Sequence, residues 1–155
     1  MLAHNPDLYN VSLKILLKNS KGEVLALKAP ESSTMAGYYD LPGGRINEDE
    51  FTTDYAELMK RELGEEIGDD VKCILNLKPV SFGRHSYYSN KQQKEIRIIY
   101  LCFEAEYISG EIKISKEHAG FAWLDFKNIK PEDYFTKGPL EAVKRYIELK
   151  NMSSI

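Results

Sequence analysis

Short apolar runs dominate the first part of the chain and return later. Val11 to Leu17 and Val24 to Lys28 are rich in Val, Ile and Leu, which favours β-strands. The residues between them, Asn19 to Gly22, are typical of a hairpin turn. The same pattern predicts three later strands: Cys73 to Phe82, Ile96 to Phe103 and Phe121 to Leu124.

Two segments have a helical period instead. Between Thr53 and Ile67, apolar residues recur on one face and Gly68 supplies the stop. The recurring residues are Ala56, Met59, Leu63 and Ile67. A second amphipathic helix is predicted around Leu140, Val143 and Ile147, followed by a loose tail over residues 151–155. The order of strands, helix, strands and helix predicts an α+β fold, with a mixed or antiparallel sheet packed between helices.

Length and charge narrow the classes of function. The 155 residues suit a single domain spanning residues 1–155, with one well-developed core. Lys and Arg number 21 against 24 Asp and Glu, and they are spread along the chain. This pattern excludes a basic surface for long nucleic acids, whereas a small phosphorylated ligand needs only a few local cations.

Neither a membrane-spanning run nor a signal-peptide layout is found in the sequence, so we expect a cytoplasmic protein that makes no membrane contact. Cys73 and Cys102 lie in apolar or strand-like surroundings, without a Cys-x-x-Cys pair or a histidine at metal-ligand spacing. Both are expected to be reduced, buried and inert.

Three carboxylates gather on the first predicted helix. At 100° per residue, Glu62, Glu65 and Glu66 fall within an arc of roughly 100°, beside the apolar stripe. Like charges at this spacing repel, and neither Lys60 nor Arg61 falls inside the arc. A hard divalent cation such as magnesium would supply the missing positive charge, since it takes carboxylate oxygens, water and substrate phosphate as ligands. By itself, such a cluster is more often a solvated acidic face.

The surrounding residues make a functional role for this cluster the better interpretation. Gly43 and Gly44 lie just upstream, and the helix reads Arg61-Glu-Leu-Gly-Glu-Glu-Ile-Gly68. With five residues between Gly44 and Glu50, the pattern resembles the signature of the Nudix hydrolases, whose fold is an α/β/α sandwich. The resemblance is dense over residues 39–68. Two differences stand out: ten residues separate Glu50 from Arg61 where the family usually has seven, and Asp69 replaces an apolar residue.

In the family, the first glutamate of the signature pairs with the arginine. The longer spacing leaves Glu50, Asp54 and Glu57 as alternatives here, and Glu57 has the local advantage because it lies four residues before Arg61.

The resemblance implies a metal-dependent pyrophosphohydrolase. Its substrate would be a small nucleotide-like molecule, a nucleoside diphosphate linked to another group, whose phosphoanhydride bond is cleaved by water. Glu62, Glu65 and Glu66 would hold Mg²⁺, with Mn²⁺ as an alternative. Glu117, in a loop similar to one that often carries a further ligand or a general base in the family, is a fourth catalytic candidate, whereas His118 is expected to be an ordinary loop residue. Family members often form homodimers.

Substrate choice must come from other residues. Gly83 to Lys94 is polar and lies between two predicted strands, so it is expected to form a loop that could close over a ligand. Within it, Arg84 could meet phosphate and Tyr87 could stack on a base. An ordinary solvated hairpin loop has the same composition.

Three other readings stay open. A module of the same fold could sense a nucleotide without cleaving it, although the intact glutamates argue against this. The fold also hosts isomerisation of isoprenoid diphosphates, which often needs a cysteine in a context that neither Cys73 nor Cys102 has. A structural protein with an acidic helix would show no response to metal.

Overall fold

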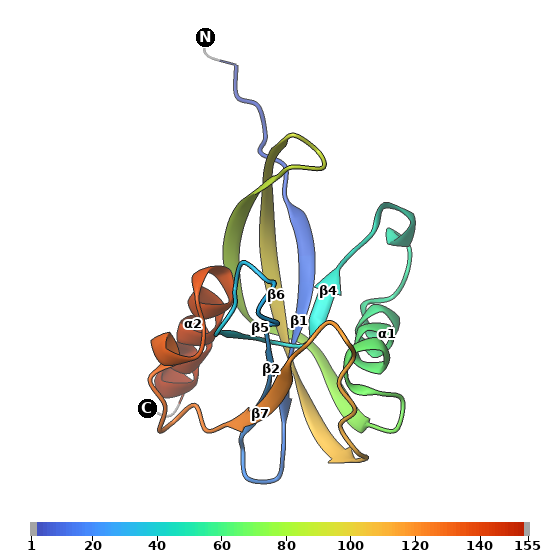
Figure 1. Cartoon of the computed structure of the whole chain (residues 1–155), viewed down its shortest axis with the longest axis vertical. Helices are drawn as coiled ribbons and strands as arrows, with labels where there is room; N and C mark the ends of the chain where they lie inside the picture. The colour runs from blue at the N-terminus through green and yellow to red at the C-terminus, as the bar shows by residue number, and fades with distance from the viewer. Residues whose placement is uncertain (1–2, 154–155) are drawn as a thin grey trace.

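A mixed β-sheet lies between two helices in the computed structural model, which describes residues 3–153 (Figure 1). The strands are β1 (Asn10–Lys18), β2 (Val24–Lys28), β3 (Tyr39–Asp40), β4 (Gly43–Arg45), β5 (Lys72–Ser89), β6 (Lys94–Ser109) and β7 (Gly120–Leu124). The helices are α1 (Tyr55–Ile67) and α2 (Lys137–Ser153), with short 3-10 turns η1 (Glu48–Glu50) and η2 (Pro131–Asp133). The predicted α+β class is confirmed.

The central strand of the sheet is β1, and its neighbours determine where the site forms. The main strand order is β3-β2-β1-β6-β5, with β4 added to β1 and β7 added to β2. β1 runs parallel to β6 along its whole length, while its pairings with β2 and β4 are antiparallel. The pairing with β4 sets Lys14 opposite Gly43. The strand that carries Gly43 and Gly44, β4, is thereby held against the middle of the sheet.

Two apolar cores, one on each face of the sheet, produce the layered arrangement. Leu13, Ile15 and Leu17 of β1 pack with the predicted apolar stripe of α1. On the other face, Leu16 of β1 packs with residues of α2, including Val143. Because side chains alternate along a strand, β1 supplies both cores. Figure 1 shows α1 and α2 on opposite sides of the strands.

The predicted loop over residues 83–94 is wrong. Residues 83–89 continue β5 and pair with residues 94–100 of β6, so only residues 90–93 form the turn. Gly83, His85 and Tyr87 face inward and alternate with exposed residues, which is the pattern of a half-buried strand. Arg84 and Ser86 belong to its outer face, whereas His85 lies on the inner one.

The C-terminal segment also differs from its prediction. Residues 151–153 extend α2 instead of forming a tail, and residues 154–155 lie outside the described part of the chain. Cys102 is buried and burial raises the pKa of its thiol to about 12, which fits the expected inert thiol. Among residues 3–153, no helix is long and apolar enough to cross a membrane.

Close contact between β5 and α2 predicts that Gly83→Ala destabilises the protein. A methyl group at Gly83 would lie 2.6 Å from the carbonyl oxygen of Gly138, at the start of α2. We expect a loss of about 1–3 kcal/mol in the free energy of unfolding, measured with urea. The matched control is Gly120→Ala in β7, where the nearest atom is 4.0 Å away and little change is expected. Equal effects of the two substitutions would contradict the packing described.

Candidate functional site

Glu66 is anchored at two points. Its Oε2 accepts a hydrogen bond from the backbone N–H of Gly43 at 2.7 Å, and its Oε1 lies 3.2 Å from Nε2 of His118. Gly43 belongs to β4 and His118 to the loop before β7, so three separate segments meet at this carboxylate. The carboxylate is almost completely buried, and these contacts offset part of the cost of removing it from water.

Gly43 and Gly44 bring the strand close to its neighbours, and a side chain at either position would displace another group. Gly43 has a φ of +139°, and a Cβ there would overlap the carbonyl of Leu13. A Cβ at Gly44 would overlap the carboxylate of Glu62. The absence of side chains therefore allows β4 to lie directly against the acidic face of α1.

Glu62 is the glutamate of this face whose ionised form is destabilised. Burial raises the pKa of its carboxyl group, and the charges of Glu66 and Glu65 raise it further. Arg61 and Lys14 act in the opposite direction without cancelling the rise. The ionised form of Glu62 is therefore less stable here than in water, as expected for a partly buried carboxylate with two others nearby.

The partner of Arg61 is Glu50, not Glu57. Nη2 of Arg61 donates to Oε1 of Glu50 at 2.6 Å, and Oε2 of Glu50 accepts from the backbone N–H of Asn47 at 2.9 Å. The additional residues of the loop bulge outward, leaving Phe51 92% exposed. The pairing of Arg61 with Glu50 forms despite the longer spacing, so the preference for Glu57 was wrong.

Arg61 also neutralises part of the acidic face, contrary to the expectation from helix geometry. Its Nη1 lies 3.4 Å from Glu62 and 3.6 Å from Glu65. A helical wheel places only the Cα atoms, whereas the long arginine side chain turns back across the face. Glu65 stays largely in solvent, with a side chain that is 60% exposed.

The donor chemistry of this face fits a magnesium ion. Mg²⁺ commonly uses one or two carboxylates and completes its shell with water and substrate phosphate. Within residues 3–153, no three acidic, His or Cys side chains form a ready-made cage, so a fully protein-bound ion is not what this arrangement suits. The pKa of Glu62 is raised by burial first and by the charges of Glu66 and Glu65 second, so a cation bound here would favour its ionised form. Glu62, Glu65 and Glu66 would hold such an ion only together with water and substrate phosphate.

A buried ion pair next to this face was missed in the sequence. Lys14 Nζ lies 2.9 Å from Oδ2 of Asp40 and 3.3 Å from the carbonyl oxygen of Leu41. Lys14 is only 8% exposed. A lysine that interrupts the apolar run of β1 was the available signal, because buried lysines are rare unless they are paired.

The two candidate substrate-binding residues lie on opposite faces of β5. Arg84 is exposed, and its backbone N–H lies 3.4 Å from Glu141 of α2. Tyr87 points inward, and the guanidinium of Arg45 lies 5.3 Å from the centre of its ring. The structure therefore does not bring Arg84 and Tyr87 together. Arg45, directly after Gly44, was not predicted from the sequence.

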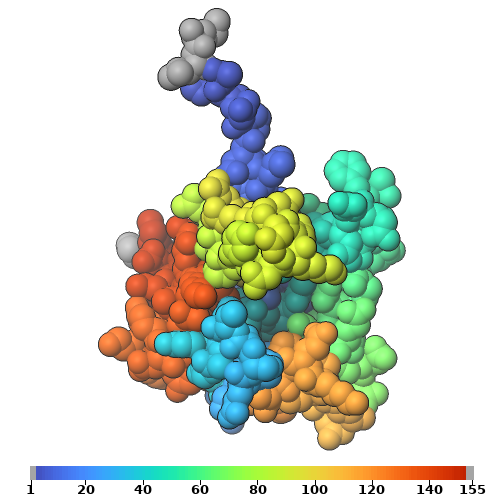
Figure 2. All heavy atoms as spheres, turned by 45° about the horizontal axis from the view of Figure 1, so that its top comes forward, coloured from blue at the N-terminus to red at the C-terminus, as the bar shows by residue number. Residues whose placement is uncertain are grey.

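A hollow opens beside the acidic face. Figure 2 shows it between the tip of the β5–β6 hairpin in yellow-green, residues 29–38 in sky blue, α1 in green and the loop before β7 in orange. That last loop carries both Glu117 and His118. Glu117 is exposed, and its backbone N–H bonds to Ser115. His118, expected to be an ordinary loop residue, contacts Glu66 instead.

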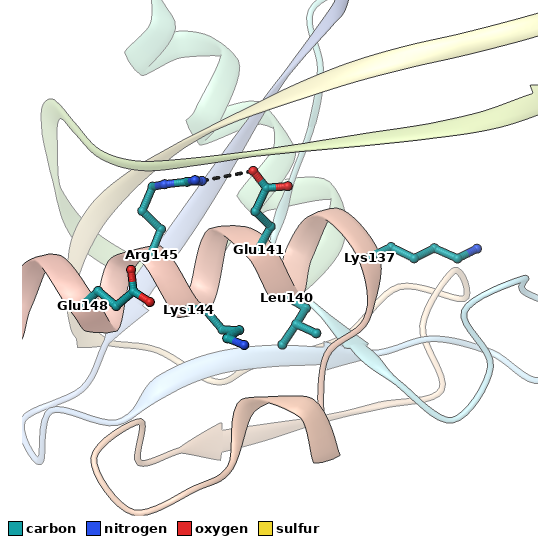
Figure 3. Close-up of a pocket in the computed structure, with 6 residues that line it drawn as sticks. All are labelled: Lys137, Leu140, Glu141, Lys144, Arg145 and Glu148. Atoms are coloured by element: carbon teal, nitrogen blue, oxygen red, sulfur yellow. Dashed lines mark hydrogen bonds and ion pairs between the residues drawn. The ribbon is translucent and has the colours of Figure 1, made fainter.

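A second hollow lies on the surface of α2 and has no comparable chemistry. Its lining residues are Lys137, Leu140, Glu141, Lys144, Arg145 and Glu148 (Figure 3). Arg145 pairs with Glu141 at 3.1 Å, and Lys144 pairs with Glu132 at 3.0 Å. These charges are satisfied within the protein, so we place the candidate site at α1.

The chain is similar to known proteins over most of its length. Residues 8–146 match the model of the NUDIX domain. The chain is 27% identical over 140 residues to nucleoside triphosphatase NudI of Escherichia coli (strain SE11), covering 88% of this chain and 93% of that protein. Among solved structures, it is similar to the MutT protein of Methanosarcina mazei Go1, with a TM-score of 0.66, 26% identity, and coverage of 95% and 96%. It also resembles the E. coli ORF135 protein in fold, with a TM-score of 0.65, 16% identity, and coverage of 93% and 92%.

The raised pKa of Glu62 predicts that Glu62→Gln stabilises the metal-free protein at neutral pH. A carboxyl group whose pKa is higher in the folded state than in the unfolded state costs stability once it ionises. The stability advantage of the variant should therefore appear as the pH rises above about 4.5, the ordinary glutamate value, and vanish in acid. Thermal unfolding in EDTA across this range measures it. A variant that is less stable than the natural chain at neutral pH would show that Glu62 is well compensated.

Proposed function

Because the chain belongs to the Nudix family of pyrophosphohydrolases, we propose that it uses magnesium to hydrolyse a phosphoanhydride bond in a nucleoside diphosphate linked to another group. The similarity to a nucleoside triphosphatase makes a further phosphate the first candidate for that group. The observation that carries the proposal is the position of α1. Its acidic face lies against Gly43 and Gly44, with Glu66 fixed by a backbone N–H.

Each glutamate of the face has a distinct part in this proposal. Glu62, Glu65 and Glu66 would hold the metal ion, which when bound neutralises phosphate charge and lowers the pKa of a coordinated water. Glu66 is the rigid member, because Gly43 and His118 fix both of its oxygens. Glu65 is the mobile member, since it is exposed and only loosely paired with Arg61. Manganese suits the same oxygen ligands and is the alternative ion.

Arg61 and Glu50 hold the shape of the site. Glu50 binds both Arg61 and the backbone of Asn47, so it ties the loop before α1 to the helix. Arg61 in turn approaches Glu62 and Glu65, and it limits the repulsion between them. Both residues therefore keep the ligands in place without touching the phosphate.

Glu117 stays the candidate for the base that accepts a proton from the attacking water. It is exposed, and its neighbour in the chain, His118, contacts Glu66. The nucleotide would occupy the hollow of Figure 2, with its phosphates toward α1. Tyr87 and Arg45 offer an aromatic ring and a guanidinium group at the side of the sheet, and both can stack on a base.

The test is release of phosphate from a panel of nucleoside triphosphates and nucleoside diphosphate derivatives, with a phosphatase added to free phosphate from the products. Turnover of at least one compound should require magnesium. Glu65→Gln and Glu66→Gln should each reduce it by more than about a hundredfold, because each removes a ligand charge. Glu57→Gln, an exposed glutamate on the same helix, is the matched control and should keep full activity.

Two results would contradict this proposal. Turnover that persists in EDTA would separate the activity from the metal. Magnesium-dependent nucleotide binding without turnover of any compound would identify a sensor instead of an enzyme.

A further inference from the structure

A cation is buried in the sheet beside the acidic face. Leu13, Ile15 and Leu17 of β1 point toward α1, so Lys14 points to the other face of the sheet, where Tyr100 of β6 also lies. The Lys14 ammonium is 5.5 Å from the centre of the Tyr100 ring. An apolar residue at this position would bury more favourably, so the charge calls for an explanation.

Asp40 compensates the buried charge of Lys14 but does not use all the N–H donors of its ammonium group. Burial acts to lower the pKa of Lys14, yet the Asp40 carboxylate outweighs it and holds the pKa above its ordinary value. An ammonium group has three donors, and within the described residues the bonds found for Lys14 are those to Asp40 and to the carbonyl of Leu41. The side chain of Asp40 is 27% exposed, so the pair can be reached from solvent.

The pair is coupled to the glutamates of α1. Lys14 lies opposite Gly43 in the pairing of β1 with β4, and the N–H of Gly43 holds Glu66. The charge of Lys14 also acts on Glu62, where it opposes the rise in pKa, and the charge of Glu66 acts to raise the pKa of Lys14. The ammonium is therefore within electrostatic range of the groups that would hold the metal.

We propose that Lys14 binds a phosphate oxygen of the substrate, and that Asp40 competes with that phosphate for the ammonium and so sets the affinity of the site for the phosphate chain. This inference rests on the proposed function, since it assumes a phosphorylated substrate at α1. Without ligand, Asp40 balances the buried charge. When substrate binds, the third N–H donor of Lys14 bonds to a phosphate oxygen, and the interaction between Lys14 and Asp40 is weakened.

This competition predicts that substitutions of Lys14 and of Asp40 change the affinity for phosphate in opposite directions. Lys14→Met removes the cation and should weaken phosphate binding. Asp40→Asn keeps an acceptor oxygen for the ammonium but removes the competing charge, so it should strengthen phosphate binding. If the pair only supports the fold, each substitution breaks the same interaction, and both should weaken binding.

The experiment is calorimetric titration with methylenediphosphonate, an unhydrolysable analogue of pyrophosphate, in the presence of magnesium. Because this probe has no base or sugar, it reports on the phosphate chain alone. We expect Lys14→Met to raise the Kd by about tenfold or more, which is the loss of one charge-assisted hydrogen bond. Asp40→Asn should lower the Kd. Lys18→Met is the matched control on β1, where the lysine lies 3.7 Å from Glu104 outside this cluster, and it should leave the Kd unchanged.

Opposite shifts in the two variants would support the proposal. A parallel loss in both, an unchanged Kd in both, or no binding by the natural chain would overturn it. If Lys14→Met does not fold, Asp40→Asn decides alone: tighter binding supports the competition, and weaker or equal binding overturns it. No hydrolysis is needed, so opposite shifts without turnover in the panel would reject the hydrolase and keep the phosphate site. Turnover in the panel together with parallel shifts would keep the hydrolase and reject the phosphate site at Lys14.

Discussion

The hydrogen bond from the backbone N–H of Gly43 to the buried carboxylate of Glu66 is the constraint on which the site depends. It joins the middle of the sheet to α1 at a point where a Cβ on Gly43 would overlap the carbonyl of Leu13. β4 can reach that point because it pairs with β1, and α1 is held there by its apolar stripe. The same contact brings Glu62 against Gly44 and gives His118 a fixed partner. The geometry of the acidic face is thus a consequence of backbone packing.

Charge is the second theme of the structure. The face carries three glutamates, and two cations approach it from different sides, Arg61 from α1 and Lys14 from the sheet. Glu50 and Asp40 each pair with one of these cations, and the pKa of Glu62 stays raised, by burial first and by the charges of Glu66 and Glu65 second. A bound magnesium ion would favour the ionised form of Glu62. Metal binding would therefore relieve an unfavourable interaction at Glu62 that the metal-free protein retains.

Regular patterns made the fold and the acidic cluster predictable from the sequence. The spacing of apolar residues located α1, and a helix of that register necessarily places Glu62, Glu65 and Glu66 near one another. The inward and outward alternation of residues 83–89 was equally present, but their polarity suggested a loop. Only the pairing with β6 and the cover of α2 distinguish a half-buried strand from a polar turn at that position.

Contacts between distant segments could not be predicted in the same way. The local rule favoured Glu57 as the partner of Arg61, and it failed because a loop of the right shape brings Glu50 closer. His118 reaches Glu66 from 52 positions away, which no spacing rule describes. Lys14 was a signal that could have been read, since a cation within an apolar strand needs an anion, although nothing in the sequence identified Asp40 as that anion.

The most direct test of this account is magnesium binding by Gly44→Ala. Gly44 does not need a left-handed backbone, and the added methyl group would overlap only the end of the flexible Glu62 side chain, so the variant should fold normally and displace that carboxylate. The account predicts an unfolding midpoint in EDTA close to that of the natural chain, together with loss of the stabilisation that magnesium gives to the natural chain. Magnesium affinity equal to that of the natural chain would contradict the claim that close packing of the glycines on α1 creates the metal site.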